Sequence, residues 1–563
     1  MEIRKRNGEM AAFDAEKIRA AMRLAFTATN VEITAQSLNS LLRAVLKRLE
    51  EVQQLTVENV QDQVEQQLMA EGYYETAKAY ILYREKRAKA RAMRERIAAR
   101  MEDPSLEGTL REIEADFDSA KYSLNLLAEQ YERLIREGMS VREQEKILVK
   151  AAIELTTMEA PRWEYLAARL QNHFFSRTVR EEMQKQNIQT FPEKLHDLAD
   201  EGLYGRYILE AYSEEELQMA GDMICPERDR LFTYAGLELL LKRYVIHTRD
   251  GKPMETPQEM FLGIALHLAM QETRDRMEWV QRFYDMLSRM EVTMATPTMA
   301  NARKPFYQLS SCFVDVVPDS LDGIYRSIDS FAKVSKFGGG MGLYFGKVRA
   351  SGSAIRGFPG AAGGVIRWIK LVNDTAVAVD QLGMRQGAVA VYLDVWHRDL
   401  PEFLQLRTNN GDDRQKAHDV FPAVCYPDLF WKLAEKNIDA KWYLMCPHEI
   451  QTVKGYALED FWGKEWERRY WECVEDPRIE KRVLTVKEIV RLVLRSAVET
   501  GTPFAFNRDT VNRMNPNSHC GMIYCSNLCT EITQNMAPVE SLGTEVRTEQ
   551  GDPVVVTTTK PGE

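Results

Sequence analysis

The sequence predicts an α/β protein with three parts: a small N-terminal module, a helical region and a region built on a parallel sheet. Two observations support this prediction. Up to about residue 290 the apolar residues recur mainly at helical spacing, whereas later short runs rich in Val, Phe and Tyr alternate with helical segments. Apolar strands separated by helices are typical of a parallel sheet buried on both faces. We therefore place the three parts at residues 1–100, 101–290 and 291–563, with the sheet bent into part of a barrel.

The N-terminal module begins with a predicted β-hairpin. Residues 3–6 alternate apolar and basic side chains, Asn7-Gly8 is a strong hairpin turn signal, and residues 9–13 can return as the second strand. Asp14 is placed to cap the helix that follows. The apolar face of that helix consists of Ile18, Met22, Ala25 and Phe26, at spacings near one or two helical turns.

Residues 76–100 form a further predicted helix, which carries nine Lys and Arg side chains. Two interpretations stay open. The helix could present an anion-binding face, or it could be a solvated helix whose charge is interrupted by Glu85 and Glu95. Residues 105–290 follow as an almost wholly helical pattern broken by prolines. We expect this region to support the part that follows, because its sequence has no cluster of chemically reactive residues.

The third part supplies alternating strands and helices. The strands are predicted at residues 312–316, 342–345, 388–395, 420–425, 442–446 and 503–506. The helices between them are predicted at residues 321–336, 365–381, 427–436 and 486–497. A last strand-like run at residues 554–558 lies close to the end of the sequence, and we expect a closed barrel to need more chain.

Composition excludes several classes of protein. Hydrophobic residues make up 45% and charged residues 28%, as in an ordinary globular protein. The formal net charge of −10 argues against a protein that coats nucleic acid. No apolar run approaches the roughly 18 residues of a membrane helix, and the N-terminus lacks the apolar core of a secretion signal. Because the eight cysteines are too sparse for a secreted disulfide framework, we predict a cytoplasmic protein.

The densest cysteine cluster lies just past the last strand of the alternating series, where α/β proteins place their active sites. Its members are His519, Cys520, Cys525 and Cys529. One interpretation is a metal or iron–sulfur centre, although spacings of five and four residues contain no CxxC pair. A second is redox or radical chemistry on one thiol. A third is a buried cysteine in a turn with no chemical role.

The residues on either side of Cys529 support the interpretation as radical chemistry. Asn527 and Glu531 lie two residues to either side of it. If the stretch is an extended loop, alternation puts the three side chains on one face. An amide, a thiol and a carboxylate would then converge on one small molecule.

Residues 527–532, Asn-Leu-Cys-Thr-Glu-Ile, resemble the finger-loop motif of class I ribonucleotide reductase large subunits, and the similarity runs from the first residues to the last. Residues 3–8, with Phe13 and Lys17-Ile18, resemble the ATP-cone module that precedes many of these enzymes. Residues 296–299 and 309–312 resemble the first barrel strand of the family, and residues 385–397 its specificity loop and following strand. The resemblance implies an ATP-cone, a helical domain and the first half of a ten-stranded α/β barrel with the finger loop.

The resemblance also implies a reaction, the reduction of ribonucleoside diphosphates to deoxyribonucleoside diphosphates. Loss of the ribose 2′-hydroxyl is difficult because hydroxide is a poor leaving group, and a radical at C3′ makes that loss easier. By the resemblance, Cys529 becomes a thiyl radical and removes the 3′-hydrogen. Glu531 serves as base for the 3′-hydroxyl, and Asn527 holds the sugar by hydrogen bonds.

Cys312 would protonate the departing hydroxyl and then form a disulfide with a second cysteine. Thr296 and Ser311 would supply hydroxyls on the substrate side. No suitable cysteine follows Cys529, so we expect the second redox cysteine beyond Glu563. The family's phosphate-binding stretch, tyrosine pair and C-terminal cysteine shuttle are not found either. We therefore expect a truncated chain that is inactive alone.

Nucleoside triphosphates are the effectors that the resemblance implies. Asp319 matches the residue that receives the effector ribose, and a helix N-cap is the alternative for it. The other residues of this site would be Arg349, Arg356, Gln381 and Arg385. In the cone, ATP or dATP would meet Lys5, Arg6 and Lys17. Gln61 stands where related cones often use a histidine, so the resemblance supports ATP binding more directly than regulation of activity.

Other partners follow from the family alone. They are a small radical-generating beta subunit that contains a metal, thioredoxin or glutaredoxin as reductant, and a second copy in a homodimer. We expect no covalently bound cofactor, no metal in this chain, and neither nucleic acid nor membrane as partner. One alternative is the adenosylcobalamin-dependent class, whose motif usually has proline where Leu528 stands. Another is a non-catalytic, cone-bearing nucleotide-binding fragment, against which the finger-loop residues and Cys312 speak.

Overall fold

The computed structural model describes residues 2–4, 10–50, 52, 54–118, 121–379, 387–536, 540–549 and 552–560. The chain divides into two compact units. Unit 1 comprises Met1–Gln186 and Pro226–Leu241, and unit 2 comprises Asn187–Cys225 and Lys242–Glu563. In the described part of the chain no helix combines the length and the apolar character needed to cross a membrane. The residues named above that lie outside the described ranges are Lys5, Arg6, Asn7, Gly8, Gln381 and Arg385.

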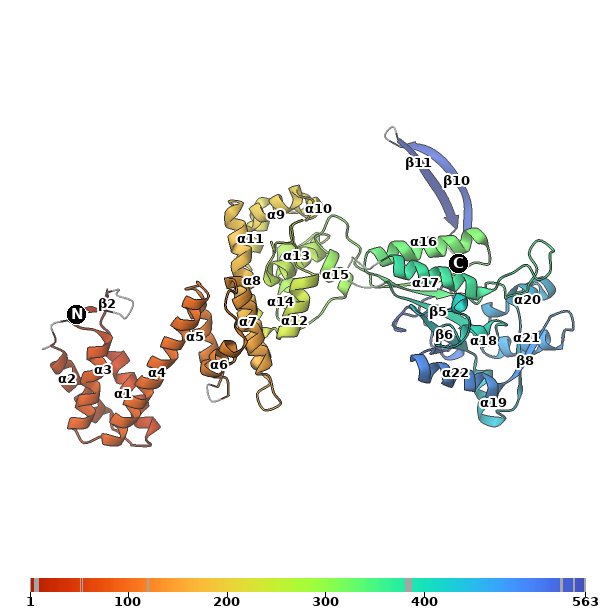
Figure 1. Cartoon of the computed structure of the whole chain (residues 1–563). Helices are drawn as coiled ribbons and strands as arrows, with labels where there is room; N and C mark the ends of the chain where they lie inside the picture. Colours follow the sequence, from red (N-terminus) through yellow and green to blue (C-terminus); the bar gives the residue numbers. More distant parts are fainter. Residues whose placement is uncertain are drawn as a thin grey trace. The chain divides into compact units, whose positions relative to one another are not determined.

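Unit 1 is almost wholly helical (Figure 1). Its elements are β1 (Glu2–Arg4), β2 (Met10–Ala12), α1 (Ala15–Ala28), α2 (Ala35–Leu49), α3 (Val57–Ala70), α4 (Tyr74–Arg100), α5 (Leu106–Asp116), α6 (Leu124–Leu134), α7 (Val141–Glu154), α8 (Trp163–Lys185), the 3-10 helix η1 (Pro226–Leu231) and α12 (Tyr234–Arg243), whose last residues belong to unit 2.

The first elements of unit 1 agree with the predicted hairpin and helix. β1 and β2 pair antiparallel. The Asp14 carboxylate caps α1 by accepting a hydrogen bond of 2.9 Å from the backbone N–H of Glu16. The predicted apolar face of α1 is confirmed, because its buried residues are Ile18, Met22, Ala25 and Phe26. They share one core with apolar side chains of α2, α3 and the start of α4.

The arginines of α4 pair with carboxylates of neighbouring helices. Arg84 pairs with two carboxylates of α3, Arg94 with two of α5, and Arg96 and Arg100 with one of α6. Lys89 pairs with Glu85 of α4 itself, so at least five of the nine basic side chains of residues 76–100 are paired with carboxylates of unit 1. This pairing favours the solvated, charge-paired helix over the anion-binding face.

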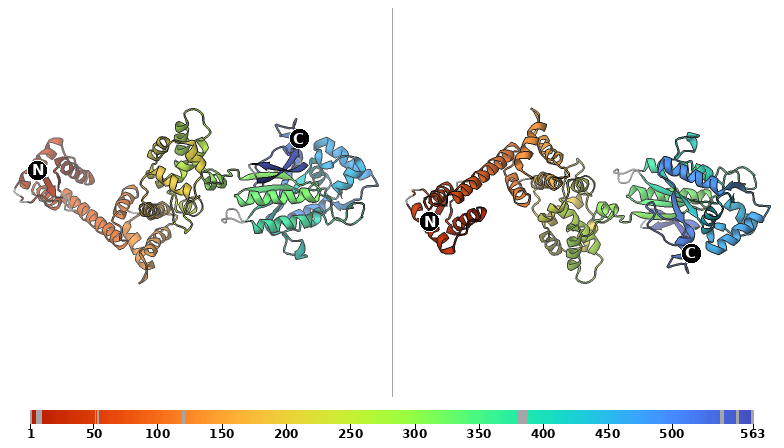
Figure 2. Two further views of the ribbon diagram at one scale, coloured as in Figure 1. Left: turned by 90° about the horizontal axis from the view of Figure 1, so that it is seen from above. Right: turned by 90° about the horizontal axis from the view of Figure 1, so that it is seen from below.

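Unit 2 begins with helices and continues into a sheet (Figures 1 and 2). Its helical part contains α9 (Phe191–Asp200), α10 (Arg206–Ala211), α11 (Glu214–Asp222), α13 (Pro257–Ala269), α14 (Arg276–Ser288) and α15 (Thr296–Asn301). The sheet part contains β3 (Cys312–Val316), α16 (Leu321–Lys336), β4 (Gly340–Tyr344), α17 (Val365–Ala378), β5 (Val389–Asp394), α18 (Leu400–Phe403), η2 (Asp413–Gln415), β6 (Val420–Tyr426), α19 (Asp428–Lys436), β7 (Lys441–Leu444), α20 (Pro447–Lys454), η3 (Leu458–Asp460), α21 (Gly463–Glu475), β8 (Arg482–Thr485), α22 (Val486–Thr500), β9 (Phe504–Asn507), α23 (Arg508–Arg513), β10 (Glu540–Glu549) and β11 (Asp552–Lys560).

Five strands form the predicted parallel sheet, in the order β3-β4-β5-β6-β9. Two predicted strands lie elsewhere. The run at residues 442–446 falls on β7, which pairs antiparallel with β8, and the run at 554–558 falls on β11, which pairs antiparallel with β10. An apolar run has the same appearance in either kind of pairing, so the sequence pattern could not separate these strands from the main sheet.

A further correction concerns residues 296–299, which the resemblance placed with the first barrel strand. They form the first turn of helix α15. Pro297 lies at the start of this helix, where a missing backbone N–H breaks no helical hydrogen bond. The first strand of the sheet begins only at Cys312.

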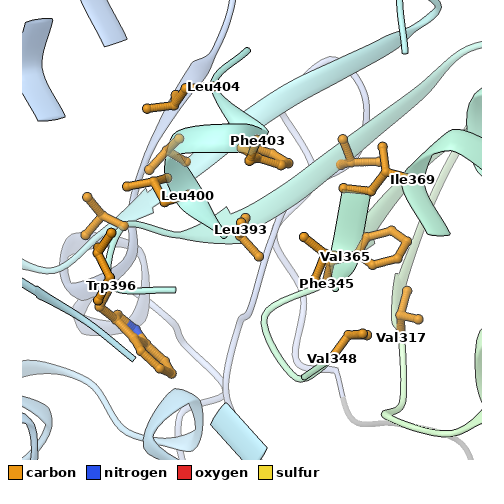
Figure 3. Packing of buried hydrophobic residues seen from close by; sticks show 14 of the residues in the cluster. Val317, Phe345, Val348, Val365, Ile369, Leu393, Trp396, Leu400, Phe403 and Leu404 are labelled. Atoms are coloured by element: carbon orange, nitrogen blue, oxygen red, sulfur yellow. The ribbon is translucent and has the colours of Figure 1, made fainter. Parts of the chain in front are cut away.

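One face of the sheet packs on α16 and α17, which lie side by side in Figures 1 and 2. Alternate strand residues point to this face, among them Met341, Leu343, Val391 and Leu393. Figure 3 shows part of this core, with Leu393 near the helices α17 and α18. Each fully buried side chain of this kind contributes roughly 1.5–3 kcal/mol, so this face fixes the sheet firmly to its helices.

The other face of the sheet is covered by the segment that leads to residues 527–532. The strand residues on this face include Tyr344, Ala390, Tyr392 and Cys425. They pack against residues 522–525, all of which are buried. The polypeptide that carries the candidate catalytic cysteine therefore lies directly on the inner face of the sheet.

Candidate active site

The loop that carries Cys529 reaches the sheet through a gap left by a glycine. A Cβ atom on Gly342 of β4 would lie 1.9 Å from the backbone oxygen of Ser526, closer than any side chain could tolerate. Leu528 packs over Gly340 in the same way, at 3.2 Å from the position of a Cβ atom there. Gly342 therefore allows the backbone of the loop to lie against the sheet, and Gly340 leaves room for the Leu528 side chain.

Residues 527–532 form a closed turn, which corrects the extended loop considered for this stretch. The side-chain oxygen of Asn527 accepts hydrogen bonds from the backbone N–H groups of Glu531 (3.1 Å) and Ile532 (3.0 Å). The Ser526 hydroxyl donates to the Ile532 carbonyl at 2.7 Å. Thr530 has a positive φ of 66°, which an extended loop would not contain. We name residues 526–532 the finger loop.

The turn brings Glu531 to Cys312 at the start of β3. The Cys312 thiol donates a hydrogen bond of 3.2 Å to the Glu531 carboxylate, and it lies 3.1 Å from the Ser311 hydroxyl. Cys529 is exposed, as is Glu531, whereas Asn527 is buried beneath them. Three of the predicted catalytic residues, Cys312, Glu531 and Asn527, thus meet in one place together with Ser311, and Cys529 lies on the same loop.

The pKa values of Cys312 and Glu531 shift in opposite directions, so the thiol is protonated and the carboxylate ionised. Partial burial raises the pKa of the Cys312 thiol, and the hydrogen bond to Glu531 raises it further against the opposing effect of Ser311. For Glu531 partial burial acts to raise the pKa, but the hydrogen bonds from Cys312, the backbone and Asn527 outweigh it and lower the pKa. At neutral pH the site therefore holds a proton donor beside a base.

Thr296 is the predicted substrate-side residue that the structure does not place at the finger loop. It is the first residue of α15, and its hydroxyl lies 3.2 Å from the hydroxyl of Tyr244. Its position in a helix follows from Pro297, which sets the first turn.

Tyr392 of β5 contacts the finger loop and was not predicted. Its hydroxyl donates a hydrogen bond of 2.8 Å to the backbone carbonyl of Asn527. Strand alternation could have placed Tyr392 on the inner face, because Val391 and Leu393 face the outer core. The partner, 135 residues further along the chain, could not be found that way.

A buried polar group below the finger loop was also missed. Arg508 of α23 forms an ion pair of 2.5 Å with Asp394 of β5, and both side chains are 1% exposed. The hydroxyl of Tyr344 donates to the same carboxylate, and Arg508 also donates to the backbone carbonyl of Glu459. Burial raises the pKa of the Glu459 carboxyl to about 7, although Lys347 at 3.5 Å acts to lower it.

The cysteine cluster does not form a metal centre in this structure. All eight cysteines lie in described ranges, and no disulfide links any two of them. Cys525 is fully buried under the finger loop, whereas Cys520 and Cys529 are exposed. Within the described residues no group of three or more His, Cys, Asp or Glu side chains is placed to hold a metal ion.

The candidate effector residues also meet in part. The Asp319 carboxylate accepts hydrogen bonds from the backbone N–H and the Nε group of Arg349, at 3.1 and 2.9 Å. His448 lies 3.6 Å from the same carboxylate. The alternative reading of Asp319 as a helix N-cap is wrong, because Ser320 caps α16 through its hydroxyl. Arg356 is exposed and has a positive φ of 49°.

The loop after Arg349 is pinned at both ends by Asp399. Its carboxylate accepts hydrogen bonds from the backbone N–H groups of Ser351, at 3.0 Å, and of Val365, also at 3.0 Å. A Cβ atom on Gly364 would lie 2.4 Å from that carboxylate, so the close approach requires glycine. Residues 351–365 therefore start and finish at one fixed point just beyond β5.

Comparison with known proteins finds matches in three ranges of the chain. Three family profiles match, described as ATP cone domain for residues 1–89, as ribonucleotide reductase, all-alpha domain, for residues 230–307, and as ribonucleotide reductase, barrel domain, for residues 310–543. The ribonucleoside-diphosphate reductase subunit alpha of Treponema pallidum is 58% identical over 570 residues, which cover 100% of this chain and 68% of that protein. The chain belongs to the ribonucleotide reductase large-subunit family.

More distant members of the ribonucleotide reductase family agree. The subunit alpha of Helicobacter pylori strain 26695 is 40% identical over 404 residues, and the large subunit of Arabidopsis thaliana is 33% identical over 413 residues. Each alignment covers 72% of this chain, but only 49% and 48% of the two relatives. The chain thus spans about two thirds of the Treponema relative and about half of these two. The family resemblance and the predicted fold class are confirmed.

Of the three basic residues predicted to bind nucleotide in the ATP-cone, only Lys17 lies in the described part of the chain. Lys17 lies in the first turn of α1, and its side chain is exposed. Gln61 lies in α3 and is half-buried. Both positions fall within the matched range of the ATP cone domain.

Proposed function

We propose that this chain carries the catalytic loop and first redox thiol of a ribonucleoside-diphosphate reductase, which reduces ribonucleoside diphosphates to deoxyribonucleoside diphosphates for DNA synthesis. The observation that carries the proposal is the hydrogen bond of 3.2 Å between Cys312 and Glu531, on a loop held by Asn527. The names of the relatives support the same reaction.

In this proposal Cys529 carries the thiyl radical. It removes the hydrogen atom from C3′ of the ribose, and Glu531 accepts the proton of the 3′-hydroxyl. The lowered pKa of Glu531 supports this role, since the carboxylate is ionised at neutral pH. The Asn527 side chain lies beside both Glu531 and Cys312 and lowers the pKa of each, which supports its assignment to the sugar by hydrogen bonding.

Cys312 supplies the proton that turns the departing 2′-hydroxyl into water. The raised pKa of Cys312 supports this role, because the thiol keeps its proton until the leaving group needs it. Cys312 and a second cysteine are then oxidised to a disulfide, while the carbon at position 2′ gains a hydrogen atom. Cys529 returns its hydrogen atom to C3′, which closes the product and restores the thiyl radical. Ser311, beside Cys312, and Thr296 are the proposed substrate-side hydroxyls.

Partners complete the proposed reaction. The alpha-subunit names of the relatives support a beta subunit as partner, and we assign to it the metal-containing generator of the radical. Thioredoxin or glutaredoxin would reduce the disulfide, and a second copy of the chain would form a homodimer. We place the protein in the cytoplasm, where such thiol reductants maintain reduced cysteines.

Two nucleotide sites regulate the proposed enzyme. The cone match supports ATP or dATP as one effector, with Lys5, Arg6 and Lys17 as its phosphate contacts. The second site uses Asp319 for the ribose of a nucleoside triphosphate and Arg349 and Arg356 near its phosphates, as the pairing of Asp319 with Arg349 supports. Gln381 and Arg385 would report effector identity to the substrate base.

The test measures reduction of cytidine diphosphate by the complete gene product, with its beta subunit and dithiothreitol. Cys529→Ser should abolish turnover and leave nucleotide binding, measured by calorimetry, unchanged. Cys520→Ser is the matched control, because Cys520 is also exposed and close in sequence. Turnover by Cys529→Ser would show that the radical assignment is wrong. Turnover that requires adenosylcobalamin instead of the beta subunit would support the alternative class.

A further inference from the structure

The hydrogen bond between Tyr392 and the finger loop joins two parts of unit 2 that are far apart in sequence. Tyr392 is fully buried, with 0% of its surface exposed, and its ring packs edge-on against Phe506 at 5.8 Å. Its hydroxyl reaches the carbonyl of Asn527 at 2.8 Å. Burial raises the pKa of Tyr392, so the phenol stays protonated and remains a donor.

The accepting carbonyl lies at the base of the catalytic turn. The side chain of the same residue, Asn527, accepts from the backbone of Glu531 and Ile532 and so closes the turn. The backbone N–H of Thr530 also donates to this carbonyl, at 3.4 Å, but it moves with the turn itself. The Tyr392 hydroxyl therefore fixes the position of this peptide relative to the sheet.

The other contacts between the sheet and the loop base are long thiol hydrogen bonds or steric contacts. The Cys525 thiol donates to the Gly342 carbonyl at 4.0 Å and the Cys425 thiol to the Tyr524 carbonyl at 3.7 Å, and both bonds involve residues before the finger loop. Gly342 lets the Ser526 backbone lie against β4, and this contact is steric. A steric contact resists approach only, whereas a hydrogen bond also has a preferred direction. The carbonyl of Asn527 needs that direction, because the peptide plane sets where the Asn527 side chain points.

We propose that Tyr392 is a positioning residue, which fixes the Asn527 peptide on β5. It thereby keeps Glu531 beside Cys312 and keeps Cys529 in the position from which it reacts. The catalytic role of Cys529 in this proposal rests on the proposed function. Its geometric part concerns only the finger loop and the sheet. Tyr392 does not touch the reacting atoms and acts through Asn527.

The test uses thiol alkylation of the purified chain, which requires no turnover. Iodoacetamide labelling of each cysteine is followed by peptide mass spectrometry over a range of pH. In Tyr392→Phe the carboxylate of Glu531 should move away from Cys312. The pH at which labelling of Cys312 is half-maximal, called here the labelling midpoint, should then fall, because that carboxylate raises the pKa of Cys312. At a fixed pH below the midpoint we expect labelling of Cys312 to be about fivefold faster, as for loss of one neutral hydrogen bond. Glu531→Gln should move the midpoint in the same direction, because the negative charge that raises the pKa of Cys312 is gone.

Two controls separate positioning from general loosening of the fold. Tyr426→Phe removes a hydroxyl from a buried tyrosine that belongs to the outer core, and it should leave Cys312 unchanged. Cys520, exposed and outside the finger loop, should be labelled at the same rate in every variant. If Tyr392→Phe leaves Cys312 unchanged, or accelerates Cys312 and Cys520 equally, the proposal is overturned.

In the complete enzyme, Tyr392→Phe should lower kcat about fivefold and leave KM for the diphosphate unchanged, because the loop geometry and not substrate binding is altered. A rise in KM alone would contradict the positioning role. Failure of the proposed function has a different result: Cys529→Ser would then retain turnover, while the response of Cys312 to Tyr392→Phe would persist.

Discussion

Asp394 and Arg508 form an ion pair in which each side chain is only 1% exposed. Asp394 ends β5, and Arg508 begins α23 directly after β9. The hydroxyl of Tyr344, from the end of β4, joins the pair. The pair therefore links three strands at their carboxyl ends, under the segment that enters the finger loop.

Asp394→Asn should destabilise the chain strongly, because it leaves the Arg508 guanidinium buried without its counter-charge. Loss of one partner of a buried pair costs about 3–5 kcal/mol. The free energy of unfolding in urea measures this change. Glu402→Gln breaks an ion pair with Arg482 whose side chains are 41% and 42% exposed, and it should cost less than about 1 kcal/mol. Equal effects of the two variants would contradict the importance of burial.

Glu459 should make stability depend on pH. Burial raises the pKa of its carboxyl to about 7 in the folded chain, above the ordinary value of 4.5. The folded state therefore binds more protons than the unfolded state between these values. This contribution is fully present below about pH 4.5 and is lost as the pH rises through about 7, with an upper limit of about 3 kcal/mol. In Glu459→Gln the free energy of unfolding should fall less steeply from pH 5 to pH 8. An unchanged slope would show that Glu459 does not titrate there.

Gly342→Ala should displace the finger loop, since the new methyl group would meet the Ser526 carbonyl at 1.9 Å. We expect a loss of about 1–3 kcal/mol in unfolding free energy, as for other overpacked sites, and an altered labelling midpoint of Cys312. Gly108→Ala is the control, because that glycine lies in helix α5 with open space around it. It should be neutral or stabilising by about 0.5–1 kcal/mol. A tolerated alanine at position 342 would refute the close approach of the loop.

Asp319→Ala should weaken nucleoside triphosphate binding at least about tenfold, because a carboxylate that orders Arg349 is lost together with a ribose acceptor. Titration calorimetry with a single triphosphate measures the change. The control Asp329→Ala breaks an exposed pair with Lys333 on helix α16 and should not change affinity. Unaltered affinity in Asp319→Ala would remove Asp319 from the effector site.

Much of the local structure could be predicted from the sequence. The buried face of α1 and the bounds of α16 follow from helical periodicity, because each depends on residues three or four apart. The four strands at 312–316, 388–395, 420–425 and 503–506 follow from apolar runs between helices. The local pattern did not decide the partner of two other strands: β7 pairs with β8 and β11 with β10, both outside the main sheet. Residues 296–299, which the resemblance placed with the first strand, form helix α15 instead.

Some features of the candidate site could likewise be predicted from the sequence, and others could not. The pairing of Cys312 with Glu531 agrees with roles that the resemblance assigned, although the two residues are 219 positions apart. The internal use of the Asn527 side chain could not be predicted, since it depends on the positive φ of Thr530. Tyr392 and Gly342 were also missed. Their importance arises from backbone atoms of the loop, which carry no sequence signal.

Strand β5 and the segment that follows it hold two separate loops. It starts at Val389, four positions after Arg385. Tyr392 holds the finger loop from its middle, and Asp399, five positions after its end at Asp394, holds both ends of the 351–365 loop. An extended strand already has nearly its full length of about 3.3 Å per residue and cannot stretch appreciably. Any displacement of β5 along its axis would therefore move the 351–365 loop and the Asn527 peptide together.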